Sequence, residues 1–104
     1  MLNHEMMLNG KYARALDMNR FGSKEEAVTF LMAMQSYAYE LLRVNGRLFL
    51  NDVYEKLDLP TSEVGKHVGW VYRENDSCIS FDIWPIRVCG DFILLDFNVD
   101  GIID

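Results

Sequence analysis

The C-terminal segment, residues 96–104, has oxygen-bearing side chains at the spacing of a calcium loop. Asp96, Asn98 and Asp100 occupy its first, third and fifth places, and Gly101 occupies the sixth. This is the opening pattern of an EF-hand loop. The bidentate glutamate of that loop belongs at a twelfth place that the segment does not reach, and a strand pattern precedes the segment where a helix is required. We therefore interpret it as a turn with solvated acids, and we predict neither a metal nor another cofactor.

A nucleophile paired with a general base is not apparent in the sequence. His4 lies among the first residues, and His67 lies close to two glycines, which is typical of a surface or capping histidine. Cys78 and Cys89 lack CxxC spacing, so we interpret both as free thiols that pack as small hydrophobic side chains. The sequence therefore predicts a protein without catalytic residues, which is not an enzyme.

Residues 51–68 have the length and the apolar pattern of a helix-turn-helix unit. Its first helix, its turn and its DNA-reading helix would be residues 51–57, 58–60 and 61–68. Asp58 stands where glycine usually makes the turn, and Lys66 with His67 supplies little positive charge for phosphate contacts. A small DNA-binding regulator is therefore the alternative function, and direct nucleic acid binding is disfavoured.

The net charge of −6 is concentrated in the last third of the chain. Residues 1–73 hold nine acidic and nine basic side chains, which cancel, whereas residues 74–104 hold seven acids and a single base, Arg87. One-sided negative charge repels nucleic acid phosphates and attracts basic protein surfaces, so we predict a partner with a basic protein surface. The candidate partner-binding residues are the acids Glu74, Asp76, Asp82, Asp91, Asp96 and Asp100, with Trp70 and Tyr72 as aromatic anchors.

A long amphipathic helix is the strongest local signal among the elements that must position these residues. Ser23 and Glu26 have the spacing of a capping box, in which each side chain accepts a hydrogen bond from the other residue's backbone N–H. Apolar residues then recur every three or four positions, and Asn45 with Gly46 supplies a left-handed stop. This pattern predicts a helix over residues 24–44.

Short strands are predicted in the second half of the chain. Residues 47–50 favour a strand, and a short helix then runs to Leu57. From residue 68 the hydrophobicity alternates with period two, which predicts a hairpin, and a third, strongly apolar strand follows. The two hairpin strands and the third strand are residues 68–72, 78–84 and 92–97.

These elements predict an α+β fold in which N-terminal helices, including the long one, pack on a small antiparallel sheet of three to four strands. Residues 1–22 carry weaker helical signals and form either part of the core or a loosely attached helical arm. The length predicts a single domain, residues 1–104. No stretch approaches the roughly 20 apolar residues of a membrane span, and the N-terminus lacks the pattern of a secretory signal. We therefore expect a cytoplasmic protein, in an oligomeric state that the sequence leaves open.

Two blocks in the second half of the chain carry a resemblance. They are residues 46–54 with 68–72, and residues 94–101. Over residues 46–104 the chain resembles small uncharacterised proteins carried by phages and conjugative elements of Gram-positive bacteria. The resemblance implies an accessory protein of a mobile element in a bacterial host cell. A small acidic product of that kind is similar to type II anti-CRISPR proteins, which implies inhibition of an RNA-guided DNA nuclease, with or without its guide RNA.

Overall fold

The computed structural model describes residues 12–104, which form two compact units. Unit 1 comprises the described residues up to Ala33 together with Ser80–Asn98, and unit 2 comprises Met34–Ile79 together with Val99–Asp104. The chain combines helices with antiparallel strands, so the predicted α+β class is confirmed. The described residues form two three-stranded sheets, in place of the single expected sheet. The single domain expected for residues 1–104 stays a prediction.

The long helix α1 spans Lys24–Asn45, one residue longer than predicted. The Oγ atom of Ser23 accepts the backbone N–H of Glu26 at 3.1 Å. The Glu26 carboxylate accepts the N–H of Gly22, and not that of Ser23 as expected for a capping box. Gly46 ends the helix in the left-handed region, with φ at 86°. Neither α1 nor any other helix within residues 12–104 is both long enough and apolar enough to cross a membrane.

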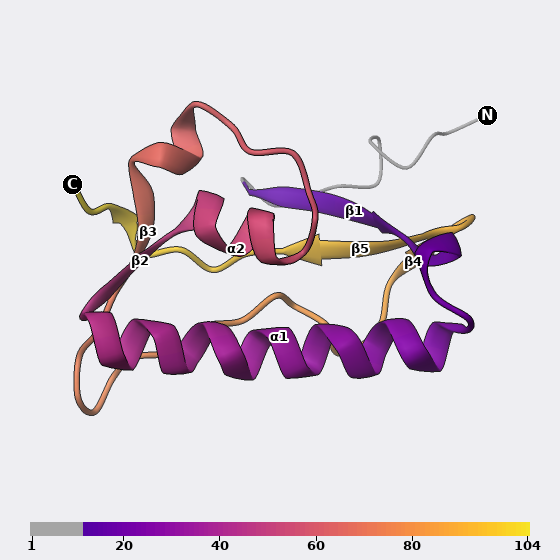
Figure 1. Ribbon diagram of the computed structural model, residues 1–104, viewed down its shortest axis with the longest axis horizontal. Coiled ribbons are helices and arrows are strands. Elements are labelled where there is room, and N and C mark those ends of the chain that lie inside the picture. The colour runs from indigo at the N-terminus through magenta and orange to yellow at the C-terminus, as the bar shows by residue number, and fades with distance from the viewer. Residues whose placement is uncertain (1–11) are drawn as a thin grey trace. The chain divides into compact units, whose positions relative to one another are not determined.

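Unit 1 contains a sheet with the strand order β1-β5-β4. The central strand β5 (Phe92–Asp96) pairs antiparallel with both β1 (Ala13–Asp17) and β4 (Val88–Cys89). β1 and β5 lie side by side over five residue pairs, from Ala13 opposite Asp96 to Asp17 opposite Phe92 (Figure 1). A single 3-10 turn, η2 (Met18–Arg20), follows β1.

Strand β1 corrects the expectation that residues 1–22 are helical. Its sequence contains good helix formers, but a few residues do not form a stable helix alone. The strand β5 is apolar and buried along its centre, and the backbone groups on both of its edges need hydrogen-bond partners. Pairing with β5 satisfies one edge and buries Leu16 completely, so tertiary structure overrides the local preference. The remainder of the predicted helical arm, residues 1–11, lies outside the described residues.

The core of unit 1 combines α1, the sheet and the irregular segment before β4. The rings of Phe81 and Phe97 lie 5.1 Å apart in a tilted arrangement. Burial of these apolar side chains is the main favourable contribution to the stability of the unit. The buried side chains of unit 1 are Leu16, Ala27, Val28, Leu31, Phe81, Ile83, Ile93, Leu94, Leu95 and Phe97.

Unit 2 contains the second sheet, with the strand order β2-β3-β6. The central strand β3 (Val68–Val71) pairs antiparallel with β2 (Arg47–Phe49) and β6 (Gly101–Ile102). Between β2 and β3 the chain forms the helix α2 (Leu50–Lys56) and the 3-10 turn η3 (Val64–Lys66) (Figure 1). The buried side chains of unit 2 are Ala38, Leu42, Leu48, Leu50, Val53, Tyr54, Leu57, Val68, Trp70 and Ile79.

The predicted hairpin of residues 68–72 and 78–84 is wrong. The strand β3 takes β2 and β6 as its partners, and residues 77–83 form no strand. Asp82 has φ at 57°, in the left-handed region, which interrupts an extended backbone. The alternating pattern nevertheless predicted correctly which side chains of this segment are buried: Ile79, Phe81 and Ile83.

Polar contacts attach the C-terminal residues to the start of β3. The N–H of Ile103 donates to the carbonyl of His67 at 2.9 Å, and Nδ1 of His67 lies 2.5 Å from Oδ2 of Asp104. The hydrogen bond with His67 lowers the pKa of Asp104 below its usual value of 3.8. This contact therefore stabilises the fold above the pKa that Asp104 has in the unfolded chain, and its contribution is lost as the pH falls through the lower pKa of the folded state.

We accordingly expect Asp104→Asn to lower the melting temperature near neutral pH. The difference from the wild type should shrink as the pH is lowered from about 6 to about 3, because the carboxylate of the wild type becomes protonated. Melting curves recorded by circular dichroism along this pH series test the expectation. A difference that grows on acidification would contradict the contact.

Candidate partner-binding site

Three of the predicted acids lie in unit 1. Asp91 occupies the exposed turn between β4 and β5, Asp96 ends β5 and is half-buried, and Asp82 holds its left-handed position. Oδ2 of Asp82 lies 2.9 Å from Nη2 of Arg87. The Nε and Nη2 atoms of Arg87 are buried and make no hydrogen bond with residues 12–104, so this is an ion pair without hydrogen-bond alignment. Asp82 therefore compensates a partly buried charge inside its own unit.

The other three predicted acids lie in unit 2, where two of them approach Arg73. Asp100 accepts the N–H of Val71 at 2.8 Å and lies 3.1 Å from Nη2 of Arg73. Asp76 is 3.9 Å from Nε of the same arginine, and its side chain is 84% exposed. Glu74 is exposed on the same turn, residues 74–76. Asp100 thus fastens the C-terminal segment, whereas Glu74 and Asp76 face solvent.

The two predicted aromatic anchors have different surroundings. Trp70 is 1% exposed in the centre of β3, where it lies opposite Leu48, so it is a core residue and does not present its ring to a partner. Tyr72 is half-buried, and its ring lies 6.4 Å from that of Tyr39 in an edge-on arrangement. Partial burial, and then the neighbouring Tyr39 hydroxyl, raise the pKa of Tyr72 above 10.0. Tyr72 therefore keeps its proton at neutral pH and remains a hydrogen-bond donor.

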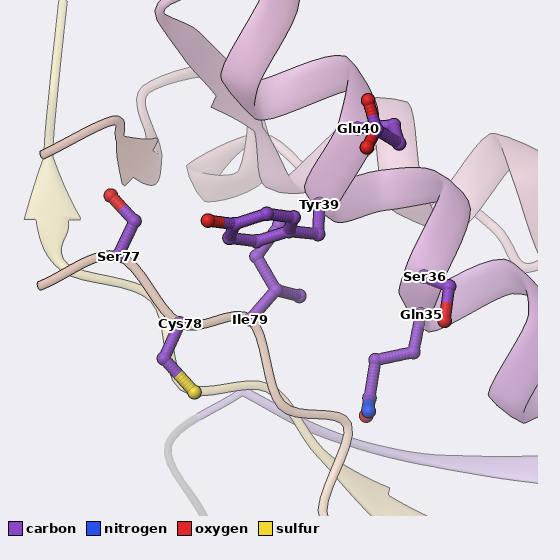
Figure 2. A pocket seen from close by; sticks show the side chains of 7 residues that line it. All are labelled: Gln35, Ser36, Tyr39, Glu40, Ser77, Cys78 and Ile79. Atoms are coloured by element: carbon purple, nitrogen blue, oxygen red, sulfur yellow. The ribbon is translucent and has the colours of Figure 1, made fainter. Parts of the chain in front are cut away.

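A polar pocket of about 390 Å³ opens beside Tyr39 in unit 2. Figure 2 shows the Tyr39 ring reaching from α1 toward residues 77–79, with its hydroxyl on the side of Ser77. A volume of this size falls within the usual range of ligand pockets, which is about 300–1,000 Å³. The side chains that line it are Gln35, Ser36, Tyr39 and Glu40 from α1, and Ser77, Cys78 and Ile79 from the irregular segment that follows the turn at residues 74–76.

The carboxylate of Glu40 is the charged group of this pocket. Arg43, one helical turn further on, donates to it from Nη2 at 2.7 Å and from Nε at 3.1 Å. Both hydrogen bonds end on the same oxygen, Oε2. They raise the pKa of Arg43. The second oxygen, Oε1, therefore remains able to accept from another donor.

Ser77 holds the opposite wall of the pocket in place. Its hydroxyl accepts the backbone N–H of Arg73 and donates to the carbonyl of Arg73 at 2.8 Å. These bonds close the turn that carries Glu74 and Asp76. Cys78 follows Ser77 directly and lines the same wall of the pocket. Within the described residues neither cysteine forms a disulfide; Cys78 is exposed, whereas Cys89 is half-buried. The expectation that both cysteines pack as small hydrophobic side chains is thus wrong for Cys78.

Unit 1 has a second, more apolar hollow of about 370 Å³. Trp84 is 61% exposed at its edge, and Met32 is 47% exposed. Val28 and Ile86 contribute to its lining. An exposed tryptophan is among the side chains that contribute most to protein interfaces, so this hollow is a secondary candidate contact surface.

The residues of the two alternative sites, the helix-turn-helix and the calcium loop, adopt other structures. Residues 64–66 form only a 3-10 turn where the DNA-reading helix was expected, and Lys66 lies 3.1 Å from Glu63. In the suggested calcium segment, both carboxylate oxygens of Asp100 are engaged by Val71 and Arg73. Within residues 12–104 no three His, Cys, Asp or Glu side chains are grouped as metal ligands would be.

Sequence reasoning did not single out the residues of the polar pocket. Gln35, Ser36, Tyr39 and Glu40 are spaced so that they share one face of a helix, and this polar stripe was a readable signal. Nothing local indicates that residues 77–79 lie opposite that stripe. Their position follows from the turn closed by Arg73 and Ser77.

The described residues thus belong to a small acidic α+β protein, whose pocket is lined by the ring of Tyr39 and the carboxylate of Glu40. More particularly, the chain belongs to the family of unknown function DUF6353, whose model matches residues 3–104. The resemblance to mobile-element proteins over residues 46–104 stays a prediction. No curated protein and no solved structure matches the chain.

Proposed function

We propose that this chain is a non-enzymatic, mobile-element-encoded inhibitor that binds a basic protein surface in the cytoplasm of a bacterial host. In its most concrete form the target is an RNA-guided DNA nuclease, and the chain acts as an anti-CRISPR-like protein. Such nucleases hold nucleic acid in positively charged channels, to which a carboxylate-rich surface is complementary.

The observation that carries the proposal is the pair of exposed carboxylates, Glu74 and Asp76, on the turn that follows the half-buried Tyr72 in unit 2. Two of the predicted contact residues lie on this turn, and the aromatic ring of Tyr72, just before it, packs against Tyr39 at the polar pocket. Unit 2 holds nine acidic and five basic side chains, a net charge of −4. A rigid aromatic pair flanked by carboxylates suits recognition of a basic surface.

Charge reversal on this turn is the sharpest mutational test. We expect Glu74→Lys combined with Asp76→Lys to weaken partner binding about tenfold or more at low salt, since rim charges act through long-range attraction that salt screens. The matched control is Glu55→Lys with Glu63→Lys, which changes the charge of the same unit equally, on α2 and immediately before η3. Asp82 is avoided, because its reversal would remove the counter-charge of Arg87 inside unit 1.

The measurement is capture of a purified type II guide-dependent nuclease by the immobilised chain, with and without guide RNA, alongside a target-cleavage assay. Capture with loss of cleavage supports the proposal, and dependence on guide RNA identifies which surface is blocked. Neither capture nor inhibition would overturn the nuclease as the target. A shift of duplex DNA in a gel that Lys66→Glu abolishes would instead favour the DNA-binding alternative.

A further inference from the structure

We infer that the polar pocket of unit 2 is a binding site for an arginine side chain of the partner protein. This inference rests on the proposed function, because a basic partner supplies the arginine. It adds the particular side chain that is recognised and the residues that recognise it: Tyr39, Glu40 and the hydroxyls of Ser36 and Ser77.

The charge of the lining selects a cation. Glu40 is the only charged side chain that lines the described pocket, and no lysine or arginine is among its lining residues. A carboxylate ligand would therefore meet a like charge, because the counter-charge of Glu40, Arg43, lies outside the lining and bonds only Oε2. A guanidinium or ammonium group meets the opposite charge at the same position.

The hydrogen-bonding state of Glu40 leaves room for a second donor. Arg43 uses only Oε2, so an incoming guanidinium is able to bond Oε1 without displacing Arg43. The Glu40–Arg43 pair is itself exposed, with about half of each side chain accessible. Exposed pairs of this kind contribute little to stability, so their rearrangement hardly opposes the binding of a ligand.

The other lining groups favour arginine over lysine. The Tyr39 ring faces the pocket, and a planar guanidinium stacks on such a ring while its N–H groups remain available (Figure 2). The hydroxyls of Ser36 and Ser77 also line the pocket, and the Ser77 oxygen has a second lone pair beside the one that accepts from Arg73. Five N–H donors in a plane can use several of these acceptors together, whereas a lysine presents three donors at one point.

The thiol of Cys78 provides a readout that does not require the partner. It is exposed, forms no disulfide and belongs to the pocket lining, so a bound side chain should shield it from alkylation. The experiment measures the rate at which iodoacetamide modifies Cys78 in the full chain carrying Cys89→Ser. The probe is the peptide acetyl-Gly-Arg-Gly-amide, and its control contains citrulline, which has nearly the same shape as arginine but no charge.

We expect the arginine peptide to slow alkylation and the citrulline peptide to have little effect. The concentration that gives half-protection should rise about tenfold in Glu40→Gln, since loss of a charge-assisted hydrogen bond corresponds to about one decade of affinity. It should rise comparably in Tyr39→Leu and little in Tyr39→Phe, which keeps the ring. Glu55→Gln is the control, because it removes the same charge from unit 2 outside the pocket.

Equal protection by the two peptides, or a half-protection concentration that Glu40→Gln leaves unchanged, would overturn the inference. The proposed function fails separately, through lack of nuclease capture by the wild type, which does not alter the thiol readout. If Glu74→Lys with Asp76→Lys weakens nuclease capture while the arginine peptide gives no protection, the pocket inference is wrong and the proposed function stands.

Discussion

Replacing Trp70 by alanine is expected to lower the free energy of unfolding by about 3–5 kcal/mol, the usual cost of truncating a large aromatic side chain in a core. The indole is 1% exposed and lies in the central strand of the unit 2 sheet, opposite Leu48. Removing it leaves a cavity among side chains that cannot all move inward. Because small domains are stable by only about 5–15 kcal/mol, this is a large fraction of the total.

The matched control for Trp70→Ala is Trp84→Ala. Trp84 is 61% exposed, so its truncation should change stability by no more than about 0.5 kcal/mol. Urea unfolding followed by circular dichroism measures both values, and Trp70→Phe provides a milder variant should Trp70→Ala not fold. In Trp84→Phe the remaining tryptophan is Trp70, whose fluorescence should resist quenching by iodide. Similar losses for the two alanine variants, or ready quenching of Trp70, would contradict the placement of Trp70 in the core.

Adding one methyl group at Gly69 is the second large effect. A Cβ atom there would lie 2.0 Å from the carbonyl oxygen of Leu48 and 2.8 Å from the Cα atom of Phe49. Both atoms belong to the backbone of β2, which pairs with β3 at this position, so no side-chain rotation relieves the overlap. Overpacking usually lowers the free energy of unfolding by about 1–3 kcal/mol. Because the overlap is with backbone atoms, we expect the loss in Gly69→Ala to be at or above the upper end of that range.

The control for Gly69→Ala is the same substitution at Gly22. A Cβ atom at Gly22 would lie 2.8 Å from Oε2 of Glu26, which is the end of a flexible side chain. Movement of Glu26 sacrifices one exposed hydrogen bond, so we expect a change of about 1 kcal/mol or less. Amide hydrogen exchange gives a local measure: the amides of β2 and β3 should exchange faster in Gly69→Ala and unchanged in Gly22→Ala. Unaltered exchange in Gly69→Ala would show that β2 and β3 are not paired this closely.

Local signals in the sequence were reliable where a single segment determines its own structure. Ser23, Glu26 and Gly46 set the ends of α1, because capping bonds and a left-handed glycine act within a few residues. The apolar run at residues 92–97 became β5, and the alternation of Ile79, Phe81 and Ile83 predicted their burial. Each of these features depends on the order of residues along the chain.

The pairing of the strands could not be predicted from the sequence. The pattern of residues 68–72 and 78–84 is that of a hairpin, yet β3 pairs with β2 and with β6 from the end of the chain. Likewise, Ala13–Asp17 is a strand because β5, far along the sequence, requires a partner at its edge. Alternation reports which faces are buried and contains no information on which strand supplies the hydrogen bonds.

For the candidate site, the composition is evident from the order of residues: the acidic excess of residues 74–104 and the aromatic residues Trp70 and Tyr72. Which of these side chains meet solvent is set by the tertiary structure. It buries Trp70, pairs Asp82 and Asp100 with arginines, and leaves Glu74 and Asp76 exposed on a turn. It also brings Tyr39 and Glu40 opposite Ser77 and Cys78. The physical reason is that exposure and charge pairing depend on contacts between segments distant in sequence, whereas propensity and capping depend on neighbours along the chain.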